Sequence, residues 1–112
     1  MTARIAVLAS GRGSNLQAIL DAIAAGRLPA EVVGVFSDRP DAAALQRVGP
    51  GQRWAHAPKT FSDRAAYEQA LGDAVHAVAP DWIVCAGYMR ILGAGFVQRF
   101  NGRLVNIHPS LL

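Results

Sequence analysis

Short apolar runs alternate with helical patterns along the chain, and this alternation constrains the fold more than any other feature. Five apolar runs have the length of strands, with the third the weakest: residues 4–9, 31–36, 53–57, 81–86 and 103–107. Between them, apolar residues repeat at helical spacing, first at Leu16, Ile19, Leu20 and Ile23 and again through residues 62–79. This order predicts an α/β fold with right-handed crossovers and an open, doubly wound, mostly parallel sheet.

Proline and polar residues predict where the helices begin and end. Proline is favoured in the first turn of a helix, so Pro40 predicts a short helix over residues 40–48. Thr60 and Asp63 form a pair that resembles a capping box before the helix at residues 62–79. Residues 89–100 are predicted to be partly helical at most. The chain ends five residues after its last predicted strand, so we expect one domain, residues 1–112, whose C-terminal part is missing.

Composition and charge exclude several classes of protein. Apolar residues make up 52% of the chain and charged residues 17%, which excludes disorder, and a single cysteine excludes a disulfide scaffold. The net charge is +3, but the cations do not cluster, so no nucleic-acid partner is predicted. No apolar run approaches the ~20 residues that cross a membrane. No set of His, Cys, Asp and Glu has the spacing of metal ligands. We expect a cytoplasmic protein without a metal.

A glycine-rich turn, Ser10-Gly11-Arg12-Gly13-Ser14-Asn15, joins the first predicted strand to the first predicted helix. Backbone N–H groups at a helix start and the helix dipole favour an anion, and glycine lets a phosphate approach closely. A dinucleotide fingerprint needs a third glycine where this chain has Leu16, and the Gly-Lys of a nucleoside-triphosphate loop is absent. The turn therefore favours a single phosphate, with a tight turn capped by Ser14 or Asn15 as the alternative.

Asn106 and His108 lie two residues apart at the end of the last predicted strand, just before Pro109. Alternation along a strand places both side chains on one face, and ligands of open α/β sheets gather at the carboxyl edge. Imidazole can shuttle a proton near neutral pH, and a carboxamide N–H can stabilise an oxygen that gains negative charge. The two residues are a candidate catalytic pair, with a structural role as the alternative.

Three further features lie at the same predicted edge of the sheet. Residues 87–92 are apolar with one cation and could line the pocket of a flat aromatic ligand, or form an ordinary buried loop. Asp38 stands where a ribose-binding acid would lie in a dinucleotide site, or it belongs to a turn or helix cap. Cys85 lies within an apolar run and is predicted to be a core residue rather than a nucleophile.

Three segments together resemble the phosphoribosylglycinamide formyltransferases of purine biosynthesis. They are VLASGRGSNLQAI at residues 7–19, AGYMRIL at residues 86–92 and GRLVNIHPSLL at residues 102–112. The last segment also marks the wider group of enzymes that use formyl-tetrahydrofolate. The Gly13-Ser14-Asn15 turn separates this family from its methionyl-tRNA and hydrolase relatives. The resemblance covers nearly the whole chain in the same order.

The resemblance implies a Rossmann-like formyltransferase fold, with this chain as its N-terminal, nucleotide-binding portion. It implies transfer of a formyl group from 10-formyltetrahydrofolate to the amine of N1-(5-phosphoribosyl)glycinamide (glycinamide ribonucleotide). The phosphate of that substrate would then be held by Gly13, Ser14 and Asn15. The folate would contact Arg64, Met89, Arg90, Ile91, Leu92 and Asn106, and catalysis would use Asn106 and His108. Members of the family carry a third catalytic residue, an aspartate, beyond the position of Leu112, so we expect the 112 residues alone to be inactive.

Two other functions stay open at this stage. A formyltetrahydrofolate hydrolase would use water in place of the amine, and a phosphate-binding fragment would bind without turnover. In each case the ligands are anionic small molecules, which suit a mildly positive chain. Both a monomer and a homodimer fit the sequence.

Overall fold

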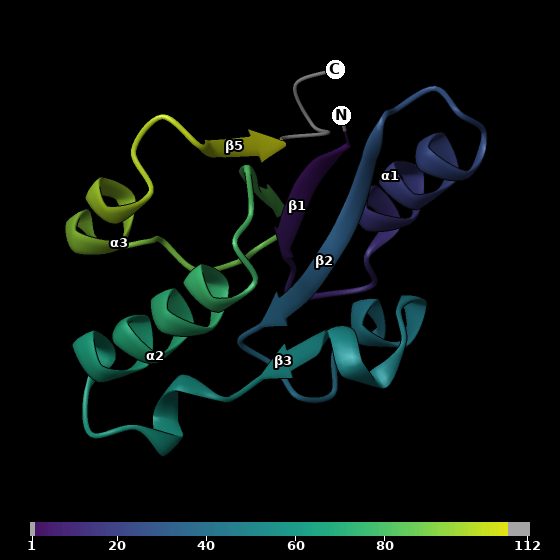
Figure 1. The fold of residues 1–112 in the computed structure, drawn as a ribbon. Helices are drawn as coiled ribbons and strands as arrows, with labels where there is room; N and C mark the ends of the chain where they lie inside the picture. The colour runs from purple at the N-terminus through teal and green to yellow at the C-terminus, as the bar shows by residue number, and fades with distance from the viewer. Residues whose placement is uncertain (1, 108–112) are drawn as a thin grey trace.

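The computed structural model describes residues 2–107 and contains a five-stranded parallel sheet with helices on both faces (Figure 1). The strands are β1 (Ala3–Leu8), β2 (Ala30–Ser37), β3 (Arg53–Ala55), β4 (Trp82–Ala86) and β5 (Leu104–Ile107). Their order in the sheet is β3-β2-β1-β4-β5, so the first strand is central. Along the chain, β2 and β3 are added on one side of β1, and β4 and β5 are then added on its other side. The predicted α/β fold with a doubly wound parallel sheet is confirmed.

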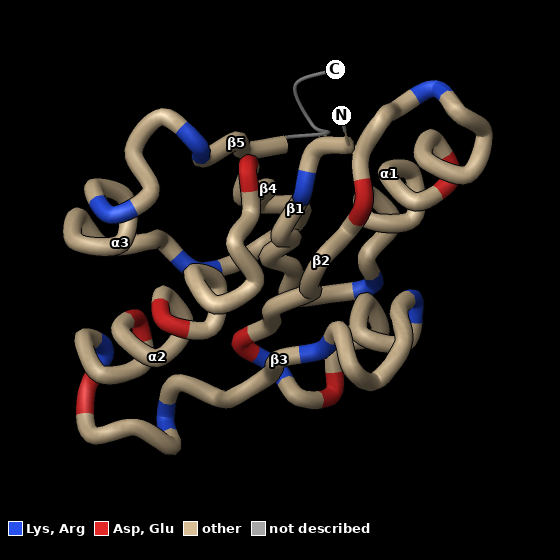
Figure 2. Tube along the Cα trace, viewed as in Figure 1, with Lys and Arg blue, Asp and Glu red and all other residues tan. Residues whose placement is uncertain are grey.

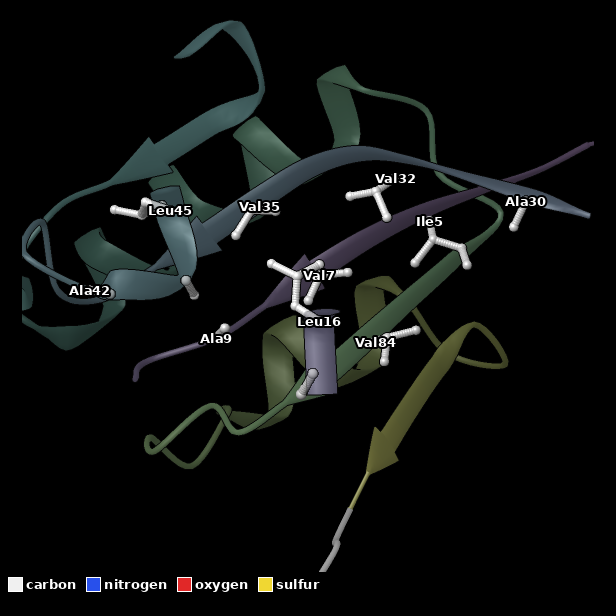
Figure 3. Close-up of a cluster of buried hydrophobic side chains, with 12 residues drawn as sticks. Ile5, Val7, Ala9, Leu16, Ala30, Val32, Val35, Ala42, Leu45 and Val84 are labelled. Carbon is white, nitrogen blue, oxygen red and sulfur yellow. The ribbon is translucent and has the colours of Figure 1, made fainter. Parts of the chain in front are cut away.

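Alternating side chains of the central strands build two separate cores. On one face, Val7 of β1 and Val84 of β4 pack with Leu16 of α1 (Ser14–Ala24) (Figure 3). On the other face, Leu8 packs with Leu71 of α2 (Arg64–Ala77), and α3 (Ala94–Arg99) adds to the same cluster. Strands covered on both faces are apolar at successive positions along their buried length. This is why the strands read as continuous apolar runs rather than as alternating patterns.

The predicted helix over residues 40–48 is wrong in type and extent. Only a 3-10 helix, η1 (Ala43–Arg47), forms there, and Pro40 precedes it in a turn where the Ala42 amide donates to the Arg39 carbonyl at 3.0 Å. The side chain of Asp38 is drawn into the sheet edge by Ser10 and Arg90, so it does not cap a helix. The glycine-proline break that follows contains a second short 3-10 helix, η2 (Pro50–Gln52).

The start of α2 also differs from the prediction. The Asp63 carboxylate accepts a hydrogen bond from the Ala66 amide at 2.8 Å and caps the helix alone. The Thr60 hydroxyl instead donates to the Ala57 carbonyl at 2.6 Å, within the 3-10 helix η3 (Pro58–Thr60). The predicted pairing of Thr60 with Asp63 is therefore wrong, because Thr60 belongs to η3 and its hydroxyl bonds back to that turn.

Charged residues are distributed over the whole molecule. Figure 2 shows Lys and Arg scattered along the trace rather than gathered on one element, with Asp and Glu between them. Several arginines pair with acids across elements, such as Arg4 of β1 with Glu31 of β2 at 3.3 Å. Within residues 2–107, no helix is both long enough and apolar enough to span a membrane.

Candidate functional site

The predicted site segments follow three neighbouring strands at the carboxyl edge of the sheet. The glycine turn follows β1, residues 87–92 follow β4, and Asn106 lies near the end of β5. Adjacent strands are about 4.8 Å apart, so the ends of β1 and β5 are separated by roughly 10 Å. The helix after β1 covers one face and the helix before β4 covers the other, which leaves the edge between β1 and β4 open.

The glycine turn is shaped by its contacts with η1. Gly13 is the N-cap of α1 with φ 81°, so Ser14 and Asn15 are already helical residues and do not occupy the cap position. The Gly11 carbonyl accepts from the Ala44 amide at 3.0 Å, and the Arg12 carbonyl accepts from Arg47 Nε at 2.8 Å. In a trans peptide the N–H points away from the C=O. These bonds therefore turn the Arg12 and Gly13 amides away from η1, in the orientation that suits an anion at the helix start.

A buried network joins this turn to the segment after β4. The Ser10 hydroxyl donates to Asp38 Oδ1 at 2.6 Å and accepts from the Met89 amide at 2.8 Å. Arg90 Nε donates to Asp38 Oδ2 at 2.9 Å, and Asp38 is only 5% exposed. Sequence reasoning considered a ribose contact, a turn or a cap for Asp38 and missed this network. The three bonds join residues 28, 79 and 52 positions apart, and no local pattern reveals such contacts.

Residues 88–92, called the ridge from here on, separate two hollows. One hollow, of about 490 Å³, lies toward β5 and is lined by the ridge together with Cys85, Val97, Leu104, Val105 and Asn106. The other, of about 570 Å³, lies toward α2 and is lined by the ridge with residues that include Lys59, Phe61, Arg64, Tyr67 and Glu68. Met89 and Ile91 stand out from the ridge with exposed fractions of 79% and 83%. Such exposed apolar side chains beside a hollow suit a flat apolar ligand.

The far end of the ridge is held by α2. Both carboxylate oxygens of Glu68 accept from the Gly93 amide at 3.1 Å. Arg64 pairs with Glu68 at 3.1 Å and also donates to the Ile91 carbonyl. Arg64 therefore lies against the ridge, as its predicted folate contact requires, although it is engaged with protein atoms.

Asn106 faces the hollow on the β5 side of the ridge. It is exposed and pairs in register with Cys85 of β4, and both residues line the hollow. Ile107 points to the opposite face and packs against the core of α1, so the predicted alternation is confirmed for these two residues. His108 lies outside the described residues.

Three buried groups near the hollows stay protonated at neutral pH. Burial raises the pKa of the Cys85 thiol to about 11, and Cys85 is part of the core cluster of α2, as predicted. The hydroxyls of Tyr67 and Tyr88 lie 2.9 Å apart, and burial raises the pKa of both. Tyr88 lines both hollows, so this neutral pair ties the body of the ridge to α2.

The structure thus brings most of the predicted site residues around the ridge. Arg64 and Asn106 lie on its two sides, while neither hollow is lined by Gly13, Ser14 or Asn15. Ser10 is the link between the glycine turn and the ridge. Within the described residues, no three His, Cys, Asp or Glu side chains are grouped so that they could hold a metal ion.

Known proteins resemble the chain over almost its full length. A family model described as formyl transferase matches residues 3–112. A phosphoribosylglycinamide formyltransferase from Haemophilus influenzae is 46% identical over 111 residues, which cover 97% of this chain and 52% of that protein. The protein of the same name from Escherichia coli is 46% identical over 110 residues, which cover 96% of this chain and 52% of that protein.

Solved structures agree with the sequence comparison. Glycinamide ribonucleotide transformylase 1 from Geobacillus kaustophilus has a TM-score of 0.91 at 40% identity, with 100% of this chain and 61% of that chain covered. Its counterpart from Symbiobacterium toebii has a TM-score of 0.89 at 40% identity, with 96% and 52% covered. The chain spans about half the length of the curated relatives it matches.

Proposed function

The chain belongs to the formyl transferase family, and on that premise we propose that it is the nucleotide- and folate-binding portion of a phosphoribosylglycinamide formyltransferase. The complete enzyme would move a formyl group from 10-formyltetrahydrofolate to the amine of glycinamide ribonucleotide, in the cytoplasm and without a metal. Two relatives named phosphoribosylglycinamide formyltransferase, each 46% identical to the chain, support the choice of the formyl acceptor. A homodimer remains compatible with this proposal.

One observation carries the proposal: the ridge and Asn106 line the same hollow. The ridge follows the strand next to β1, and Asn106 lies on the strand beyond it. The apolar side chains of the ridge, Met89, Ile91 and Leu92, would take the pterin. The amides of the glycine turn, directed away from η1, would take the phosphate of the ribonucleotide. The two ligands would then meet at the edge between β1 and β5.

The chemistry follows from a carboxamide at that meeting point. The amine nitrogen of the ribonucleotide attacks the formyl carbon, a C–N bond forms and the formyl oxygen becomes an oxyanion. The Asn106 side-chain N–H would donate to this oxygen, a contribution of roughly 10²–10³ in rate. The oxyanion then collapses, the bond from the formyl carbon to N10 of the folate breaks, and the proton lost by the amine is delivered to N10. His108 would carry that proton.

The test uses the full-length protein with 10-formyltetrahydrofolate, with and without glycinamide ribonucleotide. We expect deformylated folate to appear only when the ribonucleotide is present, in equal amount to the formylated product. Replacement of Asn106 by Ala should lower kcat by roughly 10²–10³. Asn101→Ala, at an exposed turn before β5, is the matched control and should be unaffected.

The outcome also separates the alternatives. A hydrolase would release formate at the same rate without the ribonucleotide. A protein that only binds would retain both ligands and turn over neither. Either result would contradict the proposed transfer.

A further inference from the structure

We propose that Asp38 is a positioning residue for the donor: it holds the ridge in its binding conformation through Ser10 and Arg90. This inference rests on the proposed function, because it assigns the ridge to the formyl donor. Asp38 is 5% exposed and lines neither of the two hollows that all five ridge residues line, although it lines a third hollow with Arg90 and Asp41. Its contacts with the ridge run through Ser10 and Arg90.

The carboxylate determines how the Ser10 hydroxyl is used. An ionised carboxylate only accepts hydrogen bonds, so the single proton of the hydroxyl goes to Asp38 Oδ1, 2.6 Å away. A lone pair of the Ser10 oxygen is then directed to the Met89 amide at 2.8 Å. The Ser10 amide adds a bond to the Gly87 carbonyl at 3.2 Å. Asp38 thereby fixes the backbone at the first residues of the ridge.

The second oxygen of the carboxylate fixes a side chain of the ridge. Arg90 Nε donates to Asp38 Oδ2 at 2.9 Å, and the arginine side chain is 51% exposed against 5% for the acid. A buried carboxylate without partners is strongly unfavourable, so Asp38 needs both its bond from Ser10 and its bond from Arg90. The same acid therefore orients both the Met89 backbone and the Arg90 side chain.

The ridge needs such contacts because it has no regular secondary structure of its own. Its far end is held by the Glu68 contact to the Gly93 amide, and its near end by Asp38. A segment that is loose before binding must be ordered by the ligand, and the entropic cost lowers affinity. Removal of Asp38 should therefore weaken donor binding and leave the chemical step intact.

The experiment compares three variants of the full-length protein in steady-state kinetics. Asp38→Ala should raise KM for 10-formyltetrahydrofolate by roughly tenfold, the effect of losing a hydrogen bond to a charged group. Its kcat and its KM for the ribonucleotide should stay within about twofold of wild type. Asp38→Asn keeps an acceptor for Ser10 and should recover most of the loss. Asp41→Asn is the control, because its ion pair with Arg39 joins two exposed side chains at 3.5 Å.

Amide hydrogen exchange gives a readout without substrates. Exchange across residues 87–93 should be faster in Asp38→Ala and unchanged in Asp41→Asn. If Asp38→Ala does not fold, Asp38→Asn should show the same changes at smaller size, because it loses the ion pair with Arg90 alone. The positioning role would be overturned if Asp38→Ala changed neither the exchange rates nor the KM for the donor. It would also be overturned if the variant lowered kcat and raised both KM values by the same factor. A wild-type protein without formyl transfer would refute the proposed function, while the exchange result would still decide whether Asp38 holds the ridge.

Discussion

Gly13 has two independent physical reasons to be glycine. Its φ of 81° is left-handed, and a Cβ built on it would lie 2.7 Å from the Ala44 Cβ of η1. Gly26 shares the first reason, with φ 76°, but nothing lies within 4 Å of the corresponding Cβ. The two positions therefore separate backbone strain from steric overlap.

We expect Gly26→Ala to lower the free energy of unfolding by about 1–2 kcal/mol, the cost of a left-handed alanine. Gly13→Ala should lose that amount and roughly 1–3 kcal/mol more, because η1 must shift. Urea unfolding of the two full-length variants measures the difference. Equal losses would show that η1 moves aside freely.

Cys85 offers a prediction on pH. Burial raises its pKa from 9.0 to about 11, so the reactive thiolate is scarcer at pH 8 than in an ordinary cysteine. Alkylation by iodoacetamide at pH 8 should be about 100-fold slower than for a free thiol and should rise about tenfold per pH unit up to pH 10. Mass spectrometry of the peptide that contains Cys85 follows the reaction. A rate at pH 8 equal to that of glutathione would contradict the burial.

At the scale of elements, the start of α2 depends on one side chain. Asp63→Ala removes the bond to the Ala66 amide and should destabilise the protein by about 1 kcal/mol. Thr60→Ala removes only a bond within η3 and should have a smaller effect, below about 0.5 kcal/mol. Thermal or urea unfolding of both variants gives the comparison, and a larger loss for Thr60→Ala would restore the capping pair that the sequence predicts.

Elements with strong periodicity could be predicted from the sequence, and those set by tertiary contacts could not. The apolar runs predicted the strands, and the repeat from Leu16 to Ile23 predicted a helix, close to their observed bounds. Both patterns arise because these side chains are buried in the sheet or against it. The helix predicted over residues 40–48 was wrong, because Asp38 binds Ser10 and Arg90 instead of capping a helix. No rule based on neighbouring residues contains that information.

The same distinction applies to the candidate site. The position of Asn106 at the edge of a hollow could be predicted. It follows from the alternation of side chains along a strand and from the general rule that ligands bind at the carboxyl edge of an open α/β sheet. The roles of Ser10, Glu68 and Tyr67 around the ridge could not be foreseen, because each depends on which elements become neighbours. Their contacts with the ridge span 79, 25 and 21 residues. The predicted phosphate contacts of Gly13, Ser14 and Asn15 and the role of His108 stay predictions.

For the molecule as a whole, the sheet divides the interior into two cores. Val35 belongs to the core of α1 and Val75 to the core of α2, and each is fully buried. Each Val→Ala change should cost about 2 kcal/mol for the lost methyl groups and the cavity. The double variant should lose the sum within about 0.5 kcal/mol, because the two side chains belong to different core clusters. A deviation above about 1 kcal/mol in urea unfolding would mean that the sheet transmits strain between its faces.

The central position of β1 has a consequence for synthesis of the chain. One side of β1 pairs with β2, but its other side pairs with β4, which starts at Trp82. At about 5–20 residues per second, the ribosome needs several seconds to deliver that partner. Throughout this interval the nascent chain carries an apolar strand with unpaired amides and carbonyls, a template for pairing with other chains. Fast elongation between β1 and β4, or a chaperone near the exit tunnel, would therefore decide how much of the newly made protein escapes aggregation.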